Sequence, residues 1–254
     1  MTICKHFIQG KCTHNPCKYE HTSNVCFHFF MKGNCKFGQN CPKKHVEQQR
    51  PRKNTESFTP SHKPSDMRVV IYDYTDLISY QSNDVFLVQH LFPDITYEML
   101  LEEMNKDVFK LWHGDSHLIA DDHQGWKESC YNFNMVIERL TTYFKMDVKA
   151  TRFNLYRDNT DWKPFHHDAA AIDPEKAKTQ NMTIGVSFGQ KRSACFEHAK
   201  TKTTVELPLS NGSVYGFGSK LNMEWRHGIL QETEKNDNGR ISIILWGWVD
   251  EKQV

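Results

Sequence analysis

The sequence has no long apolar run and few cysteines over most of its length. No stretch of its 254 residues approaches the roughly 20 apolar residues that a membrane-spanning helix needs, so no membrane span is expected. The start, Met1-Thr2-Ile3-Cys4-Lys5, does not have the pattern of a secretory signal peptide. After position 41 only Cys130 and Cys195 remain, which excludes a disulfide framework there. These absences predict an intracellular protein, in the nucleus or the cytoplasm.

Charge is nearly balanced overall but unevenly distributed. The chain has 32 basic and 31 acidic residues, yet the segment that ends at Asp66 contains eleven lysines and arginines against four acids, a balance of +7. The remainder therefore holds 21 basic and 27 acidic residues, a balance of −6. A basic segment of this size usually binds nucleic acid, and solvated surface charge is the alternative.

Six of the eight cysteines lie in the first 41 residues, interleaved with histidines. They form two consecutive sets of three cysteines and one histidine, each with a final Cys-x3-His spacing. Three thiolates and one imidazole are the tetrahedral complement of a closed structural zinc site. Neither segment has enough apolar residues for a core, so bound zinc must supply the folding energy. The predicted zinc ligands are Cys4, Cys12, Cys17 and His21, followed by Cys26, Cys35, Cys41 and His45.

These two sets resemble tandem CCCH zinc fingers, a family whose common role is to bind single-stranded RNA. The resemblance implies that aromatic rings stack between bases, and the matching rings are Tyr19 and Phe37. Stacking of this kind is worth about 1–3 kcal/mol per base. The chain departs from the family at His14 and Lys43, where a second ring of each finger would be expected. Fingers that bind protein are the alternative.

Beyond the fingers, residues 46–66 are polar and predict a flexible linker, because they cannot offset the entropy of ordering. Apolar residues at every third or fourth position predict a long helix over 124–146. A shorter helix is expected over 97–105, with Asp94 or Thr96 as its cap. Strand-like patterns occur at 67–72, 85–88, 147–158, 182–189, 194–201, 204–209, 212–218, 224–230 and 240–249. Short strands at this spacing after a helix predict an α+β fold with a sandwich or jelly roll.

The segment Phe165-His166-His167-Asp168 contains a candidate metal site. In an extended strand His166 and Asp168 point to the same side, since side chains alternate with period two. His227 lies in another strand-like run and offers a third ligand. Two histidines and one carboxylate on one face of a metal, with the other positions open, are the arrangement of non-haem Fe(II) oxygenases. The sequence therefore predicts an iron site, although the H-x-D triplet by itself is a weak signal.

Two further pairs of polar residues are expected near this iron. Asn154 and Tyr156 share one face of the strand before the metal segment, and Arg240 and Ser242 share one face of the last strand. These residues suit a dicarboxylate that chelates iron through its keto-acid end. Its other carboxylate would need an arginine that binds both oxygens, with neighbouring side chains that add hydrogen bonds. A surface arginine is the alternative for Arg240, but its apolar neighbours favour a partly buried charge.

From about Leu111 to Trp248 the sequence resembles the AlkB family of Fe(II)/2-oxoglutarate dioxygenases. The resemblance rests on Trp112-His113-Gly114-Asp115, Asn154-x-Tyr156, His166-x-Asp168, Val186-Ser187-Phe188-Gly189, Leu207-Pro208-Leu209-x-x-Gly212-Ser213, Trp225-x-His227 and Arg240-x-Ser242. It implies a double-stranded β-helix with iron on His166, Asp168 and His227. It also implies that Arg240, Tyr156 and Asn154 bind 2-oxoglutarate. The implied reaction hydroxylates an N-methyl group, which is then lost as formaldehyde.

The chain departs from the AlkB pattern in two places. A second family arginine would fall on Trp246, and Ala169 follows the metal aspartate where DNA-repair members carry an acid. His113 occupies a position where an aromatic often covers the flipped base, which makes it a candidate substrate contact. DNA-repair members use a hairpin to wedge open a duplex. The first 110 residues show no sequence pattern for this hairpin. This favours a single-stranded substrate, RNA in particular.

Taken together, these features predict zinc fingers at 1–45, a linker at 46–66 and a dioxygenase domain at 67–254. The expected cofactors are Fe(II), 2-oxoglutarate and two structural Zn(II) ions. The expected substrates are dioxygen and alkylated bases in RNA or other single-stranded nucleic acid. A protein hydroxylase or demethylase with the same iron chemistry is one alternative. A non-enzymatic RNA-binding protein is another, against which the complete set of metal and cosubstrate residues weighs.

Overall fold

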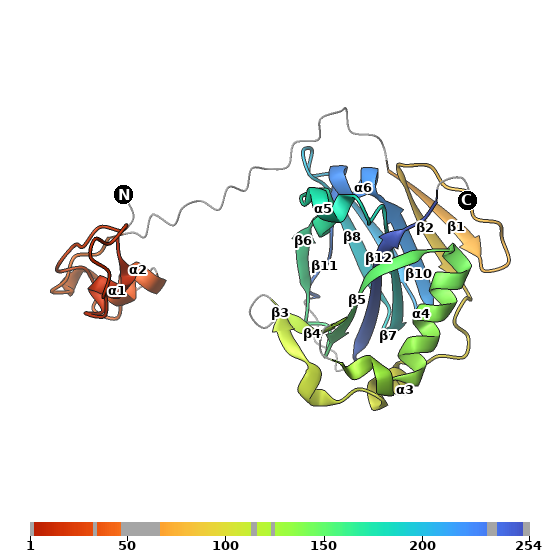
Figure 1. Ribbon diagram of the computed structural model, residues 1–254, viewed down its shortest axis with the longest axis horizontal. Coiled ribbons are helices and arrows are strands. Elements are labelled where there is room, and N and C mark those ends of the chain that lie inside the picture. Colours follow the sequence, from red (N-terminus) through yellow and green to blue (C-terminus); the bar gives the residue numbers. More distant parts are fainter. Residues whose placement is uncertain are drawn as a thin grey trace. The chain divides into compact units, whose positions relative to one another are not determined.

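The computed structural model describes residues 3–32, 35–46, 67–112, 116–122, 125–232 and 238–250. The chain divides into two compact units, Met1–Ser57 and Phe58–Val254 (Figure 1). Apart from Val46, the predicted linker at 46–66 lies outside the described residues, and so does His113. Within the described ranges no helix is long and apolar enough to cross a membrane.

The N-terminal unit contains two copies of one small arrangement. Each copy has a short helix after its first cysteine and an isolated parallel bridge that brings the residue before the last histidine close to the start of the copy. In each copy a phenylalanine of the helix stacks on that histidine with the ring centroids 4.1 Å apart: Phe7 on His21, and Phe29 on His45. The elements are α1 (Lys5–Ile8), α2 (Phe27–Lys32) and η1 (Gly38–Asn40).

The second unit is built on two sheets, which together form the predicted jelly roll (Figure 1). The larger sheet has the order β1-β2-β10-β7-β12-β5-β4-β3 and the smaller one β6-β11-β8-β9. Their strands are β1 (Arg68–Asp73), β2 (Asp84–Gln89), β3 (Lys110–Trp112), β4 (His117–Asp121), β5 (Asp147–Tyr156), β6 (Lys163–His166), β7 (Met182–Gly189), β8 (Arg192–His198), β9 (Thr204–Leu209), β10 (Ser213–Gly218), β11 (Trp225–Ile229) and β12 (Arg240–Trp248).

Strand alternation gives the larger sheet two chemically different faces. On β12 the odd-numbered residues 241–245 belong to a core that also contains the buried residues of the helices α3 (Tyr97–Glu102) and α4 (Tyr131–Phe144). The even-numbered side chains point the other way, and Ile244 and Trp246 pack in a second core with residues of the smaller sheet. Arg240 and Ser242 are even-numbered like Ile244, so their side chains point to the same face of the sheet. The polar residues of β12 therefore face the space between the two sheets.

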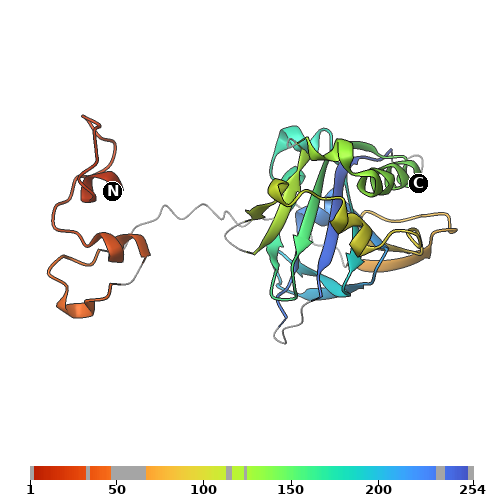
Figure 2. The ribbon, with the colours of Figure 1, turned by 90° about the horizontal axis from the view of Figure 1, so that it is seen from below.

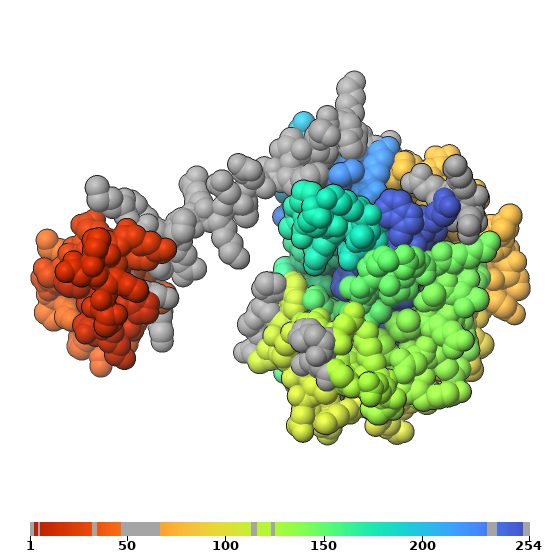
Figure 3. All heavy atoms as spheres, in the orientation of Figure 1, coloured from red at the N-terminus to blue at the C-terminus, as the bar shows by residue number. Residues whose placement is uncertain are grey.

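Helices pack on the outer face of the larger sheet. Figure 2 shows the longest helix lying against this sheet, and in Figure 3 green and yellow-green atoms cover much of that side of the second unit. The helical elements are α3 (Tyr97–Glu102), η2 (Lys106–Val108), η4 (Trp126–Ser129), α4 (Tyr131–Phe144), η5 (Ala169–Ala171), α5 (Pro174–Ala177) and α6 (Ser219–Glu224). As expected, Thr96 caps α3, its side chain accepting a hydrogen bond from the N–H of Met99.

The helix predicted over 124–146 is shorter in the structure, where α4 begins only at Tyr131. Gly125 has a left-handed φ of 67°, and Cys130 leaves the helical region at φ −103° and ψ 88°, so η4 and α4 are separate elements. No neighbouring side chain caps α4. Instead the carboxylate of Glu103 accepts hydrogen bonds from the N–H groups of Asn132 and Phe133, both at 2.7 Å.

Candidate active site

Three predicted metal ligands meet in the space between the sheets. His166 ends β6, and its Cα pairs with that of His227 on β11. Asp168 lies beyond the end of β6, so the strand expected to carry both His166 and Asp168 is shorter than predicted. The backbone of Asp168 nevertheless stays extended, at φ −67° and ψ 153°. As a result, one ligand atom from each of the three side chains lies within 4.8 Å of the others.

The distances within this triad leave room for a single ion. Asp168 Oδ1 lies 3.7 Å from His166 Nε2 and 3.6 Å from His227 Nε2, too far for hydrogen bonds. His166 Nδ1 lies 2.9 Å from the carbonyl oxygen of Pro164, which places its proton on Nδ1 and leaves Nε2 free to bind. Burial lowers the pKa of His166 well below its ordinary value. The imidazole is therefore neutral, as a metal ligand must be.

Asp168 is held by two residues that the sequence reasoning did not identify. Thr183 Oγ1 donates a hydrogen bond to Asp168 Oδ2 at 2.8 Å. The side chain of Asn222, on α6, accepts from the Asp168 N–H at 2.9 Å and donates to its carbonyl oxygen at 3.3 Å. Burial would raise the pKa of the Asp168 carboxyl, but His227, His166 and Lys163 lower it well below its usual range. Asp168 thus presents a charged oxygen to both histidines.

Arg240 has the geometry of a carboxylate receptor. It is 1% exposed, and its Nε donates a hydrogen bond to Ser187 Oγ at 2.9 Å. Its two terminal nitrogens are buried and have no hydrogen-bond partner among the described residues. A buried guanidinium with two unsatisfied nitrogens is unfavourable unless a ligand supplies acceptors. A carboxylate of a bound ligand fits this fork bidentately.

The other predicted cosubstrate contacts surround Arg240. Pairing of β5 with β12 places Tyr156 opposite Arg240 and Asn154 opposite Ser242. The Tyr156 ring lies 5.0 Å from the Arg240 guanidinium and stacks on His117, with centroids 4.8 Å apart. Asn154 donates to the carbonyl oxygen of Ser242 at 2.9 Å, and its Oδ1 lies 3.2 Å from His117 Nε2. Part of the hydrogen-bonding capacity of Asn154 is therefore used within the protein.

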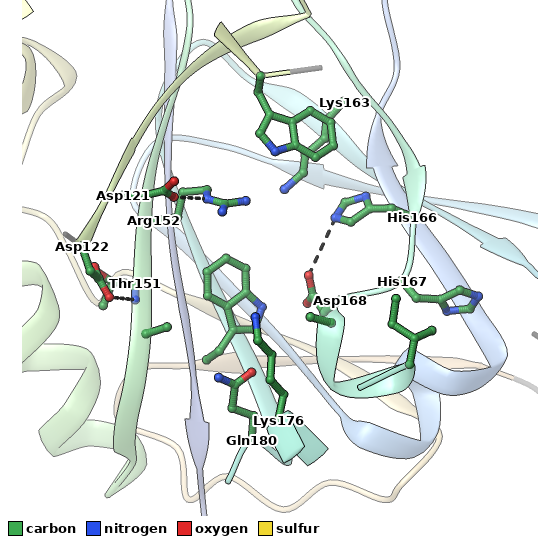
Figure 4. Close-up of a pocket in the computed structure, with 15 residues that line it drawn as sticks. Asp121, Asp122, Thr151, Arg152, Lys163, His166, His167, Asp168, Lys176 and Gln180 are labelled. Atoms are coloured by element: carbon green, nitrogen blue, oxygen red, sulfur yellow. Dashed lines mark hydrogen bonds and ion pairs between the residues drawn. The ribbon is translucent and has the colours of Figure 1, made fainter. Parts of the chain in front are cut away.

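Two cavities adjoin the triad. The outer cavity measures about 500 Å³, and its lining includes Trp112 and Arg152 (Figure 4). The inner cavity, lined in part by Tyr156, is only about 20 Å³, so a dicarboxylate could enter only if side chains moved apart. Three residues line both cavities: Lys163, Asp168 and Trp246.

Two tryptophans form walls of the outer cavity. The Trp112 ring lies 6.0 Å from the ring of His166. The Trp246 ring lies 5.5 Å from the guanidinium of Arg152, and its Nε1 is buried with no hydrogen-bond partner among the described residues. Trp246 stands where the AlkB pattern would have its second arginine. The sequence reasoning named both tryptophans only as motif positions and gave neither a role in the site.

Among the described residues three cations are buried: Lys163, Arg192 and Arg240. Of these, Lys163 lines both cavities at the triad. Its exposure is 6%, and burial lowers its pKa to about 8. Its presence in the strand that carries the first metal ligand was a signal that the sequence reasoning passed over. His117 and Asn222 had no such signal, because they enter the site on β4 and α6, which were not predicted.

The pKa of Lys163 predicts how pH affects stability. Between about pH 8 and 10.5 the unfolded chain keeps the Lys163 proton and the folded chain has lost it. The unfolded state then binds more protons, so stability should rise with pH by roughly 3 kcal/mol over this window. We expect Lys163→Met to lack this rise, so the difference in unfolding free energy between wild type and variant, measured by chemical denaturation of the metal-free protein, should change by this amount between about pH 8 and 10.5. An unchanged difference from pH 7 to 10.5 would contradict it.

The N-terminal unit brings together both predicted zinc sets. In each set of three cysteines and one histidine the ligand atoms lie within 4.8 Å of one another, and all eight cysteines of the chain are free. The sulfurs of Cys12 and Cys17 are 3.8 Å apart, and those of Cys26 and Cys35 are 3.7 Å apart. Thiolates that bind one tetrahedral zinc at about 2.3 Å would be about 3.8 Å apart. Both sets could therefore hold zinc.

A jelly roll with two histidines and a carboxylate around one point has the architecture of a mononuclear non-haem iron oxygenase. Residues 94–245, more than half of the chain, match the model of the 2OG-Fe(II) oxygenase superfamily, and the chain belongs to this superfamily. The superfamily implies Fe(II), 2-oxoglutarate and dioxygen as reaction partners.

Among solved structures, the chain is similar to an oxidoreductase of the 2OG-Fe(II) oxygenase family from Burkholderia pseudomallei. The two are 12% identical with a TM-score of 0.44, over 64% of this chain and 82% of the other. No curated protein sequence matches the chain significantly.

Proposed function

We propose that the chain is an AlkB-type dioxygenase that oxidatively removes methyl groups from alkylated bases in RNA or other single-stranded nucleic acid. In this proposal residues 1–45 are CCCH fingers, 46–66 a linker and 67–254 the catalytic domain. The outer cavity carries the proposal, because it reaches the triad and has two tryptophan walls. Flat aromatic walls suit a planar base that has been taken out of a stack.

Each residue of the site would have a distinct role in this reaction. When bound, Fe(II) with 2-oxoglutarate and dioxygen supplies the oxidising power. His166, Asp168 and His227 would hold the ion from one side and leave the opposite positions open. Arg240 would fix the distal carboxylate of the cosubstrate, so that its keto-acid end meets the ion. Trp112 would hold the base beside the triad and exclude water.

The overall reaction balances without a further reductant. One oxygen atom of O₂ becomes the hydroxyl of a hydroxymethyl group on the base nitrogen. The other oxygen atom enters succinate as 2-oxoglutarate loses CO₂. The hydroxymethyl carbon then leaves as formaldehyde, and the nitrogen regains its proton. Succinate and formaldehyde should therefore form in equal amounts when the methylated base is consumed.

Mass spectrometry of nucleosides tests this function. Methylated RNA and DNA, single-stranded and duplex, would be incubated with the full chain, Fe(II), 2-oxoglutarate and ascorbate. We expect loss of a methylated nucleoside with matching formaldehyde, fastest on single strands. Succinate with no change in any nucleoside would contradict the proposal. Hydroxylation of an added protein under the same conditions would point to the protein-modifying alternative.

The exposed rings of the N-terminal unit support contact with nucleic acid. Tyr19 is 43% and Phe37 is 55% exposed. The ammonium of Lys18 lies 5.1 Å from the centre of the Tyr19 ring, and that of Lys36 lies 4.9 Å from the centre of the Phe37 ring. An exposed ring with a cation beside it offers a base a stacking surface and its phosphate a counter-charge.

Removal of these rings should weaken binding to single strands. We expect Tyr19→Ala and Phe37→Ala each to raise the Kd for an oligonucleotide by about 5- to 150-fold, the equivalent of one lost stack. Fluorescence anisotropy at fixed salt measures this change. Tyr131→Ala is the matched control, because that tyrosine is 72% exposed in the other unit. Equal weakening by Tyr131→Ala, or none by the finger variants, would count against binding through the fingers.

A further inference from the structure

Lys163 occupies a position between the two cavities that none of the roles above explains. It lines the outer cavity with Trp112 and the inner cavity with Tyr156. In the close-up its ammonium points into the outer cavity, towards the region between Arg152 and His166 (Figure 4). The ammonium lies 5.4 Å from the centre of the Trp112 ring. Lys163 is therefore a buried cation beside the metal triad.

No described carboxylate forms an ion pair with Lys163, because the acids around it have other partners. Asp121 pairs with Lys110 and Arg152, both at 2.7 Å. Asp168 accepts from Thr183 and faces the two histidines. A lysine that is 6% exposed and unpaired within the described ranges is unfavourable in the ligand-free protein. An anion that enters the site would relieve this cost.

The position of Lys163 identifies which anion it suits. Arg240 lies behind one wall of the inner cavity, because its guanidinium is 5.0 Å from the ring of Tyr156, which lines that cavity, and its two terminal nitrogens have no partner among the described residues. Lys163 lies at the boundary between the inner and the outer cavity, which it shares with the metal ligand Asp168. A keto dicarboxylate that spans this space places its second carboxylate at the metal. Trp246, on the same boundary, offers an indole N–H but no charge.

We propose that Lys163 holds the metal-side carboxylate of 2-oxoglutarate and so forms, with Arg240, a receptor with one cation for each end of the cosubstrate. The proposal rests on the placement of the cosubstrate between the triad and Arg240. Lys163 is a positioning residue. Its ion pair would set the orientation in which the keto acid approaches the metal. Trp246 lines the same boundary, and its buried indole N–H has no partner among the described residues.

Ligands that carry one or both ends test the proposal. The full chain with Mn(II) at the triad would be titrated calorimetrically with 2-oxoglutarate and with oxalate, which has only the metal-chelating end. We expect Lys163→Met to raise the Kd for both ligands by at least about tenfold, the equivalent of one charged hydrogen bond. Arg240→Met should raise the Kd for 2-oxoglutarate and leave that for oxalate unchanged. Lys176→Met is the matched control, because this lysine lines the outer cavity but is exposed.

A second measurement separates positioning from damage to the fold. Lys163→Met retains the length of the side chain and removes an unpaired buried charge, so at pH 7 the metal-free variant should melt at a higher temperature than the wild type. Mn(II) affinity should not fall, because the variant removes a positive charge beside the ion and leaves its three ligands in place. If wild type binds 2-oxoglutarate and Arg240→Met does not, while Lys163→Met binds both ligands like wild type, the role of Lys163 is overturned. If wild type fails to bind 2-oxoglutarate, the proposed function itself fails.

Discussion

Asp168→Ala should abolish 2-oxoglutarate turnover. Asp168 is the charged member of the triad, and without it two neutral imidazoles would have to hold a divalent ion alone. Loss of a residue that only supports a ligand typically costs 10- to 100-fold in metal affinity or activity, so loss of the ligand should exceed about 100-fold. Succinate formation with an excess of Fe(II) measures the effect.

Two controls make the Asp168→Ala result specific. Asp147→Ala removes a carboxylate that is 65% exposed at the start of β5 and should leave turnover unchanged. The zinc content of the Asp168 variant should equal that of wild type, since the cysteine sets lie in the other unit. Succinate production at the wild-type rate by Asp168→Ala would show that the ion is held by other residues.

Arg240→Met should raise the Kd for 2-oxoglutarate by about 100-fold or more. The two terminal nitrogens of Arg240 have no partner among the described residues, so a bidentate carboxylate contact would be lost together with its charge. Binding of Mn(II) should stay the same, because Arg240 is not a metal ligand. Isothermal titration of the Mn(II)-loaded protein measures both quantities.

Arg192 provides a matched comparison for Arg240. It is 2% exposed and lies 5.6 Å from the ring of Tyr156, but its guanidinium donates to the carbonyl oxygens of Asp161 and Leu230. Arg192→Met should therefore lower the melting temperature and change the Kd far less. Arg240→Met should not destabilise the ligand-free protein. If both variants weakened binding equally, the effect would reflect the overall positive charge and not a specific contact.

The sequence predicted the parts of the fold whose signal is local. β7 and β9 have the predicted limits, 182–189 and 204–209, because period-two patterns and turn residues bound them. The close approach of His166, Asp168 and His227 could also be foreseen, since an extended backbone keeps residues two apart on one side. This held for Asp168 although β6 ends before it. That these residues bind iron remains a prediction.

Features that depend on long-range contacts could not be predicted. The start of α4 is set by Glu103, a residue distant in sequence, and no local pattern reveals it. His117 reaches Asn154 only because β4 pairs with β5, and β4 was not predicted. Asn222 supports Asp168 from α6, a helix that lies between two predicted strands and was not itself predicted. Each of these residues is positioned by tertiary structure and not by its neighbours in the chain.

The two faces of β12 have a consequence for how this enzyme can evolve. The odd-numbered side chains of the strand pack in the core under the helices, and the even-numbered side chains line the ligand site. A single substitution at an inward position, for example at Trp246, would alter the chemistry of the site without disturbing the packing on the other face. An insertion or deletion of one residue would instead exchange the two faces and destroy both. Lineages should therefore diversify this site by replacement within a strand of fixed length.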